Sequence, residues 1–101
     1  MSKLEKIQAM LAESPDDLFL RYSLAMELRK TGDVDRAREA FAKVREIDPD
    51  YVPAYFQEGQ LLAEAEQRDA AEKILQQGIN VAQRVGDDHA LEEMREFLEM
   101  L

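Results

Sequence analysis

Residues 18–51 contain two amphipathic helical patterns joined by a tight turn, and this arrangement constrains the fold more than any other feature. Small residues, Ala25 in the first pattern and Ala37 in the second, stand where two paired helices would have to approach closely. The bulkier Leu28 and Phe41 recur at helical spacing and would fill the space between the two helices. The segment is therefore predicted to be one pair of antiparallel helices.

The following residues, 52–85, repeat the same plan with a period of 34 residues. Four positions match at this spacing: Leu28 with Leu62, Asp35 with Asp69, Ala37 with Ala71, and Phe41 with Leu75. A period of this length, built from pairs of helices, is typical of a stacked solenoid. The chain is therefore interpreted as a helical repeat protein.

The unit resembles the tetratricopeptide repeat (TPR), in its short bacterial form, over about two-thirds of the chain. The first unit carries the family pattern at Leu24-Ala25, Leu28, Ala37, Phe41 and Pro49, and the second at Tyr55, Gly59, Leu62, Ala71 and Leu75. The resemblance implies an all-α fold, an α-solenoid of TPR-like helix pairs. It also implies a non-enzymatic role in protein–protein interaction, as an adaptor or scaffold.

Four residues depart from the family pattern: Arg21 stands where Trp is usual, Glu58 for Leu, Glu66 for the turn glycine, and Gln83 for Pro. The departure at the second turn matters most for the backbone. Gly32 in the first turn can adopt a left-handed conformation at little cost, whereas the same conformation is costly for Glu66 at the equivalent place.

The repeats and their flanks predict about six helices in a single domain spanning residues 1–101. A helix at residues 3–13 is in phase with the second half of a preceding unit, and full repeats follow at 18–51 and 52–85. A final helix at 88–101 is in phase with the first half of a third unit and is expected to cap the stack. Near the start of the first repeat, Ser14 is expected to cap a helix with its hydroxyl.

The net charge of −9, from 22 acidic and 13 basic residues, limits the partners of this chain. Such a field repels phosphate, so neither nucleic acid nor an anionic membrane is expected as a partner, and cationic or apolar partners fit better. No cysteine is present, which excludes disulfides and thiolate chemistry. With no signal peptide or membrane span recognised in the sequence, a cytoplasmic location is expected.

No constellation of residues in the sequence supports catalysis, a metal site or a cofactor. His89 is the sole histidine, and Glu93 follows it one helical turn later. A catalytic metal site needs about three protein ligands, usually several imidazoles or thiolates, and this chain does not provide them. The chain also lacks a glycine-rich phosphate loop and a Gly-x-Ser-x-Gly elbow. It is therefore not expected to be an enzyme.

The first helix of the first repeat has an unusually wide apolar arc, about 220° at about 100° per residue. In the resemblance, the additional part of this arc lines the concave surface of the solenoid. The predicted peptide-binding groove comprises Phe19, Tyr22, Met26, Arg29, Phe56, Gln60 and Met94. It would hold an apolar or amphipathic peptide or helix, basic where charged. The alternative is that these side chains pack against one another as the core of a short stack.

The final helix carries more apolar surface than a cap requires. Its apolar residues are Ala90, Leu91, Met94, Phe97, Leu98, Met100 and Leu101, and they cover about half of its circumference. Exposed apolar patches commonly mark interfaces, and a twofold contact is the commonest way to bury one. A homodimer formed through this helix is the alternative functional hypothesis.

Overall fold

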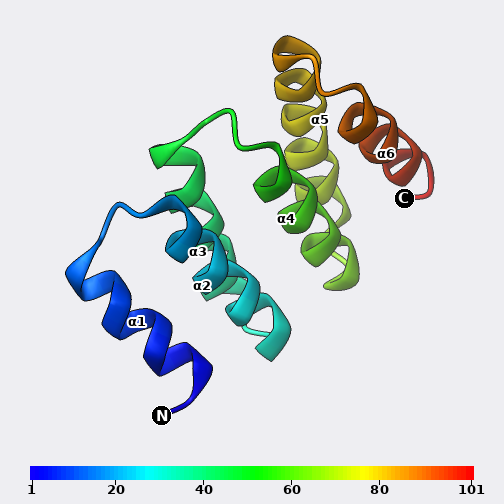
Figure 1. The fold of residues 1–101 in the computed structure, drawn as a ribbon. Helices are drawn as coiled ribbons and strands as arrows, with labels where there is room; N and C mark the ends of the chain where they lie inside the picture. Colours follow the sequence, from blue (N-terminus) through cyan, green and yellow to red (C-terminus); the bar gives the residue numbers. More distant parts are fainter. The chain divides into compact units, whose positions relative to one another are not determined.

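The computed structural model describes residues 1–101 and contains six α-helices and no strand (Figure 1). The helices are α1 (Lys3–Glu13), α2 (Leu18–Thr31), α3 (Val34–Ile47), α4 (Val52–Glu64), α5 (Arg68–Val85) and α6 (Asp88–Glu99). The chain divides into two compact units, Met1–Asp48 with α1 to α3 and Pro49–Leu101 with α4 to α6. The all-α fold class is confirmed, while a single domain over residues 1–101 stays a prediction.

In the first unit, α2 packs against α3 and α1 packs against α2. Ala25 of α2 and Ala37 of α3 have no exposed surface, as expected for small residues at a close helix contact. Phe41 is also fully buried, and its ring meets that of Tyr22 edge-on. The residues that define the repeat in the sequence thus form the core of this unit.

In the second unit, α4 packs against α5 and α6 packs against α5. Two glycines lie where these helices touch. A Cβ atom on Gly78 would lie 2.6 Å from Tyr55 Cβ and 2.7 Å from Met94 Sδ, and one on Gly59 would lie 2.5 Å from Leu75 Cδ2. The close packing of α5 against both neighbours therefore depends on the missing side chain at residue 78.

Three helices, α2, α4 and α5, end in the same left-handed turn. The residue in the left-handed conformation is Gly32 (φ 82°), Glu66 (φ 61°) and Gly86 (φ 79°), respectively. In each turn the following N–H donates back to a carbonyl five residues earlier, as in Gln67 to Leu62 at 2.8 Å. The second turn therefore has the geometry of the first, with a glutamate in a conformation that glycine adopts more cheaply.

Aspartates cap the starts of three helices. The backbone N–H groups of Leu20, Arg36 and Ala90 donate to the carboxylates of Asp17, Asp33 and Asp87, at 3.0, 3.2 and 3.1 Å. The prediction that Ser14 caps a helix start with its hydroxyl is wrong, because Ser14 is the C-terminal cap of α1 and Asp17 caps α2. The carboxylate was better placed because helix α2 begins at Leu18, after the turn that contains Pro15.

Candidate functional site

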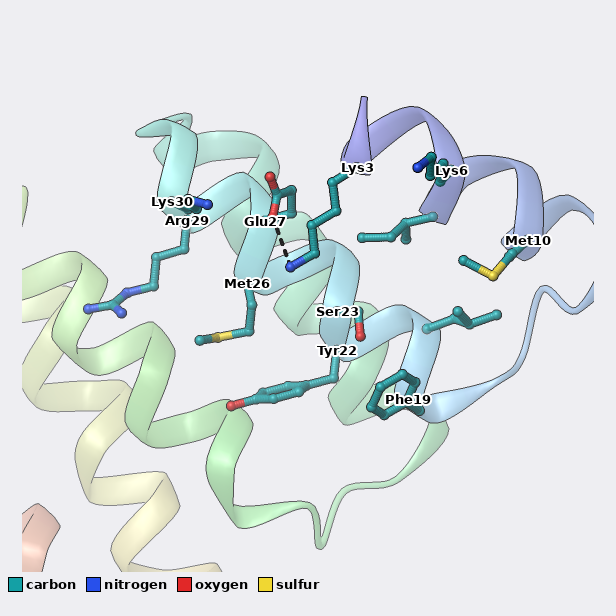
Figure 2. A pocket seen from close by; sticks show the side chains of 12 residues that line it. Lys3, Lys6, Met10, Phe19, Tyr22, Ser23, Met26, Glu27, Arg29 and Lys30 are labelled. Carbon is teal, nitrogen blue, oxygen red and sulfur yellow. Dashed lines mark ion pairs between the residues drawn. The ribbon is translucent and has the colours of Figure 1, made fainter. Parts of the chain in front are cut away.

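A cavity of about 610 Å3 lies between α1 and α2 in the first unit and is here called the α1–α2 cavity (Figure 2). Its lining is mainly apolar, and it is open to solvent. It is lined by Lys3, Lys6, Ile7 and Met10 from α1, and by Phe19, Leu20, Tyr22, Ser23, Met26, Glu27, Arg29 and Lys30 from α2. The size and the apolar lining are those of a site that accepts side chains of a ligand.

Four of the seven predicted groove residues, Phe19, Tyr22, Met26 and Arg29, line this one cavity. Their spacing of three or four residues places them along one side of α2. Phe19 is 74% exposed, although it is a large aromatic residue, while Tyr22, Met26 and Arg29 are partly buried. Phe19 is the member of this set with the most surface free for a ligand.

Basic residues outnumber acidic residues in the lining of the α1–α2 cavity, although the chain as a whole is strongly negative. Lys3, Lys6, Arg29 and Lys30 are basic, and Glu27 is the single acidic residue of the lining. Lys3 Nζ lies 3.8 Å from Glu27 Oε2 in an ion pair that joins α1 to α2 (Figure 2). The cavity therefore combines an apolar floor with a basic rim, which the net charge does not predict.

The contribution of α1 to this site was missed in the sequence analysis. The predicted groove drew only on the first helix of each repeat, whereas Lys6 and Met10 belong to the helix before the first repeat. Met10 is 48% exposed, so α1 carries an apolar residue on its open side. The distribution of charge along the sequence is a signal for the basic character of this site, because nine of the 13 basic residues lie in residues 1–48.

Phe56 and Gln60, two further predicted residues, line a separate hollow of about 450 Å3 in the second unit. Val52, Pro53 and Gln57 line it from α4, and Asp87, His89, Ala90 and Glu93 from α6 and its N-terminal cap. The ring of Phe56 meets that of Phe97 edge-on, with centroids 5.9 Å apart. This hollow contains two carboxylates and no lysine or arginine, so its charge is opposite to that of the α1–α2 cavity.

Met94, the seventh predicted residue, lies elsewhere. It has no exposed surface, and Gly78 of α5 provides the space for its sulfur atom. The structure therefore places Met94 in the core of the second unit, where a ligand does not reach it. Helical periodicity assigned it to the apolar side of α6 but did not reveal that α5 covers that side.

The acidic and imidazole side chains form no metal centre in this structure. His89 Nε2 lies 3.2 Å from Glu93 Oε1, but no group of three or more His, Cys, Asp or Glu side chains is arranged to hold an ion. None of the six helices has both the length and the hydropathy needed to cross a membrane.

Comparisons with known proteins agree with the geometry of the helix pairs. Residues 28–91 match the family model described as tetratricopeptide repeat. A TPR repeat-containing protein of Pseudomonas aeruginosa is 32% identical over 98 residues, which are 97% of this chain and 93% of that protein.

Two solved structures are similar along almost the whole chain. A protein from Bordetella parapertussis has a TM-score of 0.87 and 27% identity, with 99% of this chain and 87% of the other covered. The TPR2B domain of yeast Sti1, solved in complex with pHsp70, has a TM-score of 0.85 and 19% identity, with 95% and 77% covered, and so shows the fold alone. With the family match over residues 28–91 and the Pseudomonas relative, these findings show that this chain belongs to the tetratricopeptide repeat family.

Proposed function

We propose that this chain is a protein-binding module that holds an apolar or amphipathic helix or peptide in the α1–α2 cavity. The TPR fold generally mediates protein–protein interaction and is generally not enzymatic. The observation that carries the proposal is the 74% exposed Phe19 at the edge of a mainly apolar cavity of about 610 Å3. An exposed aromatic beside an apolar hollow provides contact area that a partner can bury.

The rim of the cavity suggests the charge of the partner. Lys6 and Lys30 are exposed and make no ion pair in the chain, so an acidic group on a ligand would gain two new partners. The basic partner expected from the net charge does not fit this cavity. It fits the hollow of the second unit better, where Asp87 and Glu93 accompany Phe56.

The binding residues in this proposal are Phe19, Tyr22, Met26 and Arg29 in the α1–α2 cavity, with Phe56 and Gln60 as a second contact region. A neighbouring structure supports a protein partner in general but no particular binding residue: the TPR2B domain of yeast Sti1 has the same fold and was solved in a complex with pHsp70. A protein or peptide partner, rather than a small molecule, and a cytoplasmic location complete the proposal.

The second candidate, a twofold contact between two copies of α6, has a weaker basis. Met100 is 75% exposed and provides apolar surface. The outer side of α6, however, carries Glu92, Glu96 and Glu99, and a twofold axis would bring these like charges together. The peptide-binding proposal is therefore preferred.

Two synthetic amphipathic helices with the same leucine pattern, one with glutamate and one with lysine at the polar positions, test the proposal. Fluorescence anisotropy of the labelled peptides should show that the glutamate peptide binds, and that Phe19→Ala weakens this binding by about tenfold. Val85→Ala is the matched control, because Val85 is exposed and apolar but lies outside both hollows. The absence of binding by either peptide, or equal weakening by both variants, would contradict the proposal.

A further inference from the structure

We propose that the occupant of the α1–α2 cavity is helix α6 of a second copy of this chain, so that copies associate head to tail. This inference rests on the proposed function, because it names the partner of the same cavity. Two observations carry it: the charge of the chain is divided unevenly between the two units, and α6 has an unused acidic and apolar side.

The two units differ strongly in charge. Residues 1–48 contain nine basic and ten acidic residues, whereas residues 49–101 contain four basic and 12 acidic residues. Nearly all of the net charge of −9 therefore lies in the second unit. The basic rim of the cavity in one copy and the second unit of another copy are electrostatically complementary, which favours their encounter.

Helix α6 has acidic groups that its own unit does not use. Glu92 and Glu93 pair within the helix, with Arg95 at 3.5 Å and His89 at 3.2 Å, respectively. Glu96 and Glu99 are exposed and make no ion pair in the chain.

Met100 completes this side of α6. It follows Glu96 by four residues and immediately follows Glu99, so the three side chains share one side of the helix end. Met100 is 75% exposed, and a flexible thioether side chain is suited to an irregular apolar cavity. This side of α6 therefore offers one apolar group beside two carboxylates, and the cavity offers an apolar floor beside two unpaired lysines, Lys6 and Lys30.

The two surfaces belong to different units and are different patches, so the contact is heterologous. Each copy that binds through its cavity still has a free α6, and each copy that binds through α6 still has a free cavity. The mean mass should therefore rise with protein concentration, either to a closed assembly in which each cavity holds the α6 of another copy or to longer open chains. Because the attraction is largely electrostatic at exposed groups, added salt should weaken it.

Sedimentation velocity of the full chain tests this inference. Wild-type protein in low salt should show a mean mass that increases between about 10 and about 500 µM, and salt at about 0.5 M should reduce this increase. The double variants Lys6→Glu, Lys30→Glu and Glu96→Lys, Glu99→Lys should each weaken association by about tenfold or more. Circular dichroism of each variant establishes that the helices are retained.

A mixture of the two double variants provides the decisive control. In the mixture, the acidic cavity of one variant meets the basic α6 of the other, so association should return to the wild-type level. A twofold contact between two α6 helices predicts instead that the Lys6→Glu, Lys30→Glu variant associates normally. A monomeric wild-type protein, or a mixture that stays monomeric, would overturn the inference. Binding of the synthetic glutamate peptide by a monomeric chain would still support the proposed function, so the two failures are distinguishable.

Discussion

The ring of Tyr22 on α2 meets the ring of Phe41 on α3 edge-on, with centroids 6.4 Å apart and planes inclined by 63°. Phe41 is fully buried in the core of the first unit, and Tyr22 lines the α1–α2 cavity. One aromatic residue therefore forms part of the core and part of the cavity wall. Groove wall and core were the alternative roles expected for this face of α2, and Tyr22 takes part in both.

Tyr22 and Phe19 should accordingly respond differently to truncation. Tyr22→Ala removes the edge contact and partly buried surface and should lower the free energy of unfolding by about 1 to 3 kcal/mol. Phe19→Ala should change it by less than about 0.5 kcal/mol, because the side chain is 74% exposed. Urea unfolding followed by circular dichroism measures both values. If Tyr22→Ala were as stable as wild type, the contact with Phe41 would not contribute to the core.

Gly78→Ala should destabilise the second unit. Alanine gains up to about 1 kcal/mol in helix propensity over glycine, but the added Cβ would lie 2.6 Å from Tyr55 Cβ and 2.7 Å from Met94 Sδ. Overpacking of this kind costs about 1 to 3 kcal/mol, so the steric term should prevail. Thermal unfolding measures the change, and Gln77→Ala at the exposed neighbouring position is the control. An increase in melting temperature for Gly78→Ala would show that α5 shifts freely against α4 and α6.

The two equivalent turns should respond in opposite ways. Gly32 has φ 82° and open space around the position of a Cβ atom. Gly32→Ala should therefore lower the free energy of unfolding by about 1 to 2 kcal/mol, through backbone strain alone. Glu66 has φ 61°, so Glu66→Gly relieves backbone strain. The free energy of unfolding should rise by about 0.5 to 1 kcal/mol, a net value that already includes the greater flexibility of glycine in the unfolded chain. Chemical denaturation of both variants gives the two signs. A loss of stability in Glu66→Gly would mean that the glutamate side chain makes a stabilising contact that exceeds the strain.

The first turn of α1 should depend on pH through Glu5. The backbone N–H of Ser2 donates to Glu5 Oε1 at 3.1 Å, and this hydrogen bond, followed by the Ser2 hydroxyl, lowers the pKa of Glu5 below its ordinary value of 4.5. A lowered folded-state pKa means that the contribution is present above the unfolded pKa and is lost as pH falls through the folded pKa. Amide hydrogen exchange in the first turn of α1 should therefore accelerate relative to the rest of the helix below about pH 4.

Glu5→Gln is the matched variant for this capping interaction. Glutamine retains an oxygen that accepts the hydrogen bond from Ser2 but does not titrate in this range. Its protection pattern should therefore be nearly independent of pH over the window in which the wild type changes. An identical pH profile in the two proteins would assign the effect to another carboxylate.

The sequence by itself determined the helix pairs and much of their core. The period of 34 residues, the small Ala25 and Ala37, and the bulky Phe41 are local or periodic features, and helical geometry converts them directly into faces. The same geometry grouped Phe19, Tyr22, Met26 and Arg29, because residues three or four apart on one helix are neighbours in any tertiary structure.

The tertiary structure alone decided which helix covers each face. Lys6 and Met10 joined the cavity, and Met94 left the predicted groove, because α1 lies beside α2 and α5 covers the apolar side of α6. Periodicity states that a face is apolar, but not which neighbour packs against it or how closely. The tertiary structure also decided the basic rim. Net charge is a sum over the sequence, whereas the charge around a cavity depends on which side chains the packing brings together.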